Sequence, residues 1–146
     1  MSGEEGMLYY QALIQKAREG VRYERILQIR ENQSVADVFG RDYAYIRHFH
    51  DMISEREKNP RLKTRILLRK AKARFLTTFV LVDEVKLLWQ VNEFIEGQGM
   101  RMRGIFVFDD PRQEITRHFK AFFDRVAADE NTESIRRDEL PKLSND

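Results

Sequence analysis

The segment from residue 75 to residue 93, FLTTFVLVDEVKLLWQVNE, consists of two apolar runs joined by the acidic pair Asp83-Glu84. β-Branched and aromatic residues are frequent in both runs, which is typical of strands, and a short polar pair between such runs is typical of a turn. The segment therefore predicts a β-hairpin with strands near 74–82 and 86–95. The chain is thereby expected to fold around a sheet that contains this antiparallel pair.

Residues before the hairpin predict two helices with a strand between them. Apolar residues in 8–19 recur every four residues, and Gly20 then provides a common helix stop. Residues 21–30 are more typical of a strand that is buried largely on one face. Ser34 and Asp37 have the spacing of a capping box, and residues 42–58 carry a second apolar helical face.

The second predicted helix ends at Asn59-Pro60, because the residue before proline is pushed out of the helical conformation. After this point the spacing of the apolar residues is that of strands. Residues 62–68 predict one more strand before the hairpin, and GIFVF at 104–108 predicts a strand after it. Asp109-Asp110-Pro111 then supplies a carboxylate cap and a proline at the first helical position. The apolar residues that follow have the spacing of an amphipathic last helix ending near Val126.

The predicted order is therefore α-β-α-β-β-β-β-α, which indicates a mixed α/β fold with one central mixed β-sheet flanked by helices. A chain of 146 residues fits one domain, which we place at residues 1–128. Residues 129–146 are mostly charged and are expected to form a polar, flexible tail.

Composition restricts the chemistry. The chain has no cysteine, so disulfides and thiolate metal sites are excluded, and its net charge is only +2. The longest apolar stretch, residues 75–82, is far shorter than the roughly 20 residues that cross a membrane. The acidic start MSGEEGM lacks the features of a signal peptide. We therefore expect a cytoplasmic protein with no membrane partner.

The three histidines do not predict a metal site. His48 and His50 stand two residues apart on a predicted helix, where their side chains point in different directions and cannot bind one metal ion. His118 lies alone on the expected solvent face of the last helix, with Glu114 as its nearby carboxylate. No metal and no cofactor are predicted, and His118 is the one candidate for an unconventional hydrolase.

Basic residues cluster between the second helix and the hairpin. If 62–68 is a strand, two of these side chains share its outer face and the others follow in the next connection, which concentrates positive charge at one end of the sheet. Such a cluster fits contact with an anion or a nucleic acid, and it equally fits a solvated edge that discourages aggregation. The cluster consists of Arg61, Lys63, Arg65, Arg69, Lys70, Lys72 and Arg74.

The hairpin, followed by RGIFVFDDP and by HFKAFFDRV, resembles the second part of a phospholipase D-like domain. That family carries an H-x-K-x-x-x-x-D motif on one strand and a G-S-x-N-like segment at the end of the next. Placing the family aspartate on Asp83 puts the histidine position at Leu76 and the lysine position at Thr78. The G-S-x-N region then falls on Gln90, Val91, Asn92 and Glu93.

The resemblance implies a domain that has lost its chemistry. In the family, a histidine attacks phosphorus and lysines neutralise the phosphate oxygens, whereas Leu76 cannot attack and Thr78 carries no charge. The polar residues that remain near the hairpin are expected to bind a ligand rather than to catalyse: Thr78, Asp83, Trp89, Gln90, Asn92 and Glu93. The alternative is that Asp83-Glu84 only turns the hairpin and that Trp89 packs in the core.

Three functions stay open at this stage. The first is a non-catalytic regulatory, ligand-sensing or dimerisation module, of the kind that degenerate phospholipase D-like domains resemble when joined to DNA-binding partners. The second is a weak, sequence-independent nucleic-acid-binding module that uses residues 61–74, and the third is the hydrolase around His118. A homodimer is expected, because single-motif members of the family pair two copies and because the chain is rich in aromatic residues. Trp89 is the expected anchor.

Overall fold

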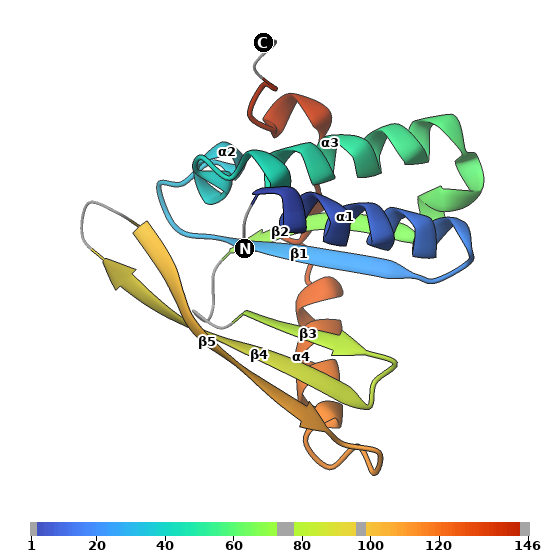
Figure 1. Ribbon diagram of the computed structural model, residues 1–146, viewed down its shortest axis with the longest axis vertical. Helices are drawn as coiled ribbons and strands as arrows, with labels where there is room; N and C mark the ends of the chain where they lie inside the picture. Colours follow the sequence, from blue (N-terminus) through green and yellow to red (C-terminus); the bar gives the residue numbers. More distant parts are fainter. Residues whose placement is uncertain (1–2, 73–77, 96–98, 144–146) are drawn as a thin grey trace. The chain divides into compact units, whose positions relative to one another are not determined.

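A computed structural model describes residues 3–72, 78–95 and 99–143 (Figure 1). The chain divides into two compact units. The first unit comprises Met1–Ala73 and Glu130–Asp146, and the second comprises Arg74–Asp129. Each has its own three-stranded sheet.

The first unit contains helices α1 (Gly3–Arg18), α2 (Val35–Phe39) and α3 (Tyr43–Lys58). Its sheet has the strand order β1-β2-β6. Strands β1 (Tyr23–Ile29) and β2 (Ile66–Lys72) are parallel, and the short β6 (Glu133–Ser134) pairs antiparallel with β2. Two short 3-10 helices, Pro60–Thr64 and Arg137–Glu139, complete the unit.

Local capping explains where α2 and α3 begin. Ser34 caps α2, and its hydroxyl and the Asp37 carboxylate form the reciprocal bonds of the predicted capping box. The Asp42 carboxylate accepts a hydrogen bond from the Tyr45 N–H at 3.0 Å and so caps α3. α3 ends before Asn59-Pro60, as predicted.

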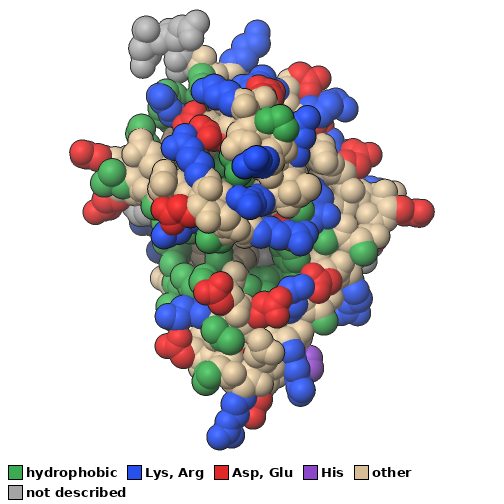
Figure 2. Space-filling view, turned by 90° about the vertical axis from the view of Figure 1, so that its right-hand side faces the viewer, with side chains coloured by type: hydrophobic (Ala, Val, Ile, Leu, Met, Phe, Trp, Pro, Cys, Tyr) green, Lys and Arg blue, Asp and Glu red, His purple; other side chains and the backbone are tan. Residues whose placement is uncertain are grey.

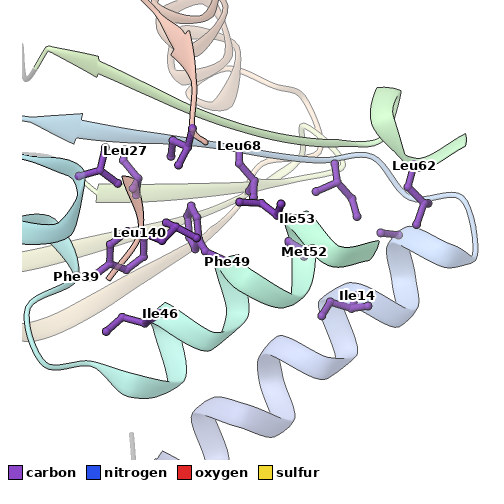
Figure 3. Close-up of a cluster of buried hydrophobic side chains, with 14 residues drawn as sticks. Ile14, Leu27, Phe39, Ile46, Phe49, Met52, Ile53, Leu62, Leu68 and Leu140 are labelled. Atoms are coloured by element: carbon purple, nitrogen blue, oxygen red, sulfur yellow. The ribbon is translucent and has the colours of Figure 1, made fainter. Parts of the chain in front are cut away.

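The core of the first unit lies between its helices and one face of its sheet. Figure 3 shows side chains from α1, α3, β1 and β2 pointing toward one another. Phe49 and Met52 of α3 are fully buried there. The buried cluster consists of Ile14, Ala17, Leu27, Val35, Phe39, Ile46, Phe49, Met52, Ile53, Leu62, Ile66, Leu68, Ile135 and Leu140.

The second unit is an antiparallel sheet with one helix. Its strands are β3 (Thr78–Val82), β4 (Lys86–Ile95) and β5 (Gly99–Asp109), in the order β3-β4-β5, and α4 spans Thr116–Ala127. The Asp110 carboxylate accepts hydrogen bonds from the backbone N–H groups of Glu114, Ile115 and Thr116. These bonds close the turn before α4, whose N-cap residue is Ile115. The predicted helix start, with a carboxylate cap at Asp109-Asp110 and Pro111 in the first turn, is therefore wrong, and Pro111 lies in a turn.

The mixed α/β class is confirmed, whereas the single central sheet is replaced by two sheets of three strands. The predicted strand at 62–68 is displaced. Pro60 and the Asn59 side chain, which accepts from the Arg61 N–H at 3.2 Å, begin a 3-10 helix at Pro60–Thr64 instead. β2 therefore starts only at Ile66.

The C-terminal segment differs from the flexible tail that the sequence predicted. Ile135 is 1% exposed and Leu140 is 6% exposed, and both belong to the core of the first unit. The Ile135 N–H also donates to the Leu68 carbonyl at 3.0 Å. Burial of these two apolar residues and the ion pairs of Glu139 with Lys70 and of Arg137 with Glu57 hold the segment in the first unit.

Candidate functional site

Three of the predicted ligand-binding residues come together on the second unit. Thr78 of β3 pairs in register with Gln90 of β4. Asn92 lies two residues further along β4, on the same face as Gln90, and its side-chain amide donates to the Thr78 hydroxyl at 3.4 Å. These are neutral hydrogen-bonding groups, so the cluster can hold a polar ligand but provides no acid, base or nucleophile of the usual kinds.

The other three predicted residues lie elsewhere. Asp83 is in the exposed turn between β3 and β4, with a φ of 50°, and is five residues from Thr78, roughly 16 Å along a strand. Trp89 points to the opposite face from Gln90, and its ring lies 6.0 Å from that of Phe119 on α4. Glu93 forms an ion pair with Arg103. The six residues therefore do not form one site.

The remaining catalytic candidates do not form a reactive group. Leu76 lies outside the described residues. His118 is exposed on α4, as predicted, and among the residues that the structure describes its ring has no hydrogen bond to a carboxylate. No group of three metal-binding side chains occurs in the described ranges, and no described helix is long and apolar enough to cross a membrane.

The basic cluster is divided rather than concentrated. Arg69 and Lys70 are neighbours on β2 and therefore face opposite sides of the sheet. Arg69 pairs with Glu24 at 2.7 Å, and Lys70 pairs with Glu139 and, at 3.4 Å, with Glu133. The hydrogen bond to Glu139 raises the pKa of Lys70 despite its partial burial.

Few of the predicted basic residues are available to a polyanion. Of the described members, Arg61, Lys63 and Lys72 are exposed, whereas Arg65 is half-buried; Arg74 lies outside the described residues. On the face shown in Figure 2, Lys and Arg side chains are interspersed with Asp and Glu side chains. This mixed pattern differs from the concentration of positive charge that the sequence predicted.

Strand β5 has the most exposed apolar surface of the second unit. It lies at the edge of the order β3-β4-β5, so one side of its backbone lacks a neighbouring strand within the described sheet. Phe106 is 57% exposed and Val107 is 59% exposed, although they lie on opposite faces of the strand. Ile105 and Met102 are exposed as well.

Helix α4 packs on the face of the sheet that carries Phe79, Trp89 and Phe106, toward its β3 side. The Phe79 ring of β3 lies 5.0 Å from that of Phe119 and 6.2 Å from that of Phe122. Phe106 of β5 pairs in register with Trp89, yet it remains mostly exposed. A single helix therefore protects the β3 side of the sheet and leaves the β5 edge open.

A β-bulge interrupts β5. Val91 pairs with Gly104 and the next residue, Asn92, pairs with Met102, so Arg103 is the extra residue in the ladder. The alternation of faces along β5 changes at this point, which places Arg101 and Asp109 on opposite faces of the sheet. Gly104 has open space where a side chain would lie, because no atom is within 4 Å of a Cβ at that position.

Sequence reasoning predicted this strand but did not identify it as a surface. The available signal was IFVF at 105–108, where apolar residues follow one another without alternation. Such a run indicates a strand with apolar side chains on both faces.

Comparison of the chain with protein-family models, with curated proteins and with solved structures finds no match.

Proposed function

We propose that this chain is a non-catalytic interaction module that self-associates as a symmetric dimer through the edge of strand β5. The supporting observation is an uncovered edge strand with apolar residues exposed on both of its faces, Phe106 on one and Val107 on the other. Proteins normally protect such an edge with charges, proline, a bulge or a covering element. In β5 the bulge and both arginines precede Gly104, which leaves the apolar part of the edge, residues 105–108, able to pair with another chain.

The sequence of β5 around Ile105 favours a second copy as the partner. After the bulge at Arg103 the strand is regular again, so residues 104–106 of two copies can pair antiparallel about Ile105. The two-fold symmetry repeats each contact, so one strand supplies both halves of a complementary edge.

The same register gives the exposed aromatic ring a place. Phe106 of one copy comes opposite Gly104 of the other, where the structure has open space. An aromatic side chain across from a glycine covers its bare backbone and adds apolar burial. We therefore assign the principal contact to Phe106, with Trp89 one strand further in, rather than to Trp89 alone.

The phospholipase D-like resemblance fits this proposal as a domain without catalysis. Threonine occupies the position of the family lysine, and Thr78, Gln90 and Asn92 supply only neutral polar groups. A nucleic-acid function is less favoured, because Arg69 and Lys70 are already paired with carboxylates. The hydrolase alternative is less favoured because His118 lacks a carboxylate partner among the described residues.

The molar mass in solution tests the proposal. Light scattering and sedimentation over about 1–500 µM should show the mass rising from one chain, 17.5 kDa, to twice that value, with a dissociation constant on the order of 10 µM. Phe106→Lys should remain at 17.5 kDa, whereas Phe119→Leu, an α4 change of the covered face, should still dimerise. A wild-type mass of one chain throughout this range would contradict the proposal.

A further inference from the structure

Arg25 of strand β1 is a cation in an unusual place. It lies on the same face of β1 as Tyr23 and Leu27, which is the face that packs under the helices of the first unit. Arg25 is only partly exposed, and within the described residues no Asp or Glu forms an ion pair with it. A guanidinium in such surroundings is usually paired with an anion.

Aromatic rings take the place of a carboxylate around this guanidinium. Its central carbon lies 5.1 Å from the centre of the Tyr45 ring, which is a cation–π contact. Tyr10 of α1 stacks on His48 of α3, with ring centres 4.3 Å apart, and lies 5.8 Å from Tyr45. The Tyr23 hydroxyl is 3.3 Å from the His48 Nε2 atom.

Two buried polar atoms in this cluster have unused hydrogen-bonding capacity. The Tyr45 hydroxyl and the His48 Nδ1 atom are both buried, and neither has a hydrogen-bond partner in the part of the chain that the structure describes. His48 is 1% exposed. Burial raises the pKa of Tyr45, and burial together with Arg25 lowers the pKa of His48 to about 3. At neutral pH the cluster therefore has one net positive charge, on Arg25.

Among the described residues, no carboxylate neutralises that charge through an ion pair. Burial, and to a smaller extent the charge of Asp42, raises the pKa values of Tyr10 and Tyr45. The Asp42 carboxylate accepts a hydrogen bond from the Tyr45 N–H and so already caps the positive end of α3. The charge of Arg25 and the unused donor of the Tyr45 hydroxyl thus favour the same kind of ligand.

We propose that Arg25 and the Tyr45 hydroxyl bind the oxyanion group, carboxylate or phosphate, of a small ligand. The planar guanidinium can donate two parallel hydrogen bonds to either group. The Tyr45 hydroxyl supplies a further donor that is otherwise unused. Such a site makes the first unit the ligand-sensing part of the chain, and it does not depend on dimerisation through β5.

Thermal unfolding of the full chain in different anions tests this site. All five tyrosines belong to the first unit, so near-ultraviolet circular dichroism of tyrosine reports its unfolding. At pH 7 and constant ionic strength, sodium chloride is replaced by sodium phosphate or by sodium acetate. The wild type should show a saturable rise in Tm of about 4–8 °C at roughly five times the dissociation constant of the preferred anion. The anion that produces the rise, phosphate or acetate, shows whether the site prefers a phosphate or a carboxylate group.

Variants separate a specific site from a general salt effect. Arg25→Met keeps the length of the side chain without its charge, and it should abolish the rise. Arg41→Met, at an exposed arginine of the same unit, should keep it. No rise above chloride in the wild type, or an equal rise in Arg25→Met, would overturn the proposal.

Tyr45→Phe provides a second test if Arg25→Met does not fold. Without added anion its Tm should equal or exceed that of the wild type, since the hydroxyl it removes has no partner. The anion concentration for half of the effect should rise about tenfold, because a hydrogen bond to a charged group is lost. An unchanged midpoint would overturn the role of Tyr45. The monomeric Phe106→Lys variant should show the same anion effect as the wild type.

Discussion

Two phenylalanines show how differently the two units of this protein are built. Phe49 of α3 is fully buried in the first unit, whereas Phe106 of β5 is 57% exposed in the second. The first unit has two long helices against its short strands, while the second has a single helix for a sheet whose longest strand has 11 residues. In the proposed dimer, a second copy supplies the cover that the second unit lacks.

Truncation of these two side chains should have the most unequal effects. Phe49→Ala should lower the free energy of unfolding of the first unit by about 3–5 kcal/mol, because it leaves a cavity in a packed core. Phe106→Ala should change the stability of the monomer by less than about 0.5 kcal/mol. Urea denaturation at low concentration measures both, with tyrosine signals for the first unit and Trp89 fluorescence for the second.

Similar losses for the two variants would mean that Phe106 is as well packed as Phe49. In that case the second unit would not need a partner. Phe106→Leu serves as a control, because it keeps most of the apolar area and should leave both the stability and the dimer largely intact.

Acid should destabilise the first unit through His48. The unfolded chain binds a proton at His48 near pH 6.5, whereas in the folded state burial and Arg25 lower the pKa of His48 to about 3. Since the unfolded state then binds more protons, stability falls as pH decreases from 6.5, by up to about 1.4 kcal/mol per pH unit. Urea titrations between pH 7.5 and about pH 5 should reveal this slope in the tyrosine signal.

Replacement of the histidines tests this assignment. His48→Gln cannot be protonated, and it should flatten the pH dependence of the first unit. His118→Gln, at an exposed position on α4, should leave that slope unchanged. A slope that persists in His48→Gln would assign the acid sensitivity to other groups.

The basic cluster should bind nucleic acid more weakly than its sequence suggests. Of its described members, only Arg61, Lys63 and Lys72 are exposed. Any binding to duplex DNA should therefore be weak and independent of sequence, and the logarithm of its affinity should fall with the logarithm of salt concentration with a slope of at most about −3. Fluorescence anisotropy with a labelled duplex measures the slope, and a value near −6 would contradict the division of the cluster.

The sequence predicted the elements better than their assembly. The spacing of apolar residues and the capping of helices are local properties, as the capping box at Ser34 illustrates. The sequence therefore predicted the helices at residues 8–19 and 42–58 and the strands of the hairpin. The division into two sheets was not predicted, since strand pairing between distant segments leaves no local pattern. The strand at 62–68 was displaced because Pro60 and Asn59 favoured a 3-10 turn.

Site residues were predictable only where a strand aligned them. Thr78, Gln90 and Asn92 come together because register and alternation bring them to one face. Asp83 is separated from them because it occupies the turn. The cluster around Arg25 could not be predicted, since α1, β1 and α3 supply its members and nothing in each segment alone marks them.

Charges placed at Ile105 test the central claim that this edge pairs with a second copy about that residue. Sedimentation velocity should show that Ile105→Glu and Ile105→Lys each weaken the dimer by at least roughly tenfold, because each places two like charges opposite each other across the two-fold axis. An equimolar mixture of the two variants should form a heterodimer with an affinity within about threefold of the wild type. A mixture that remains monomeric would contradict the pairing.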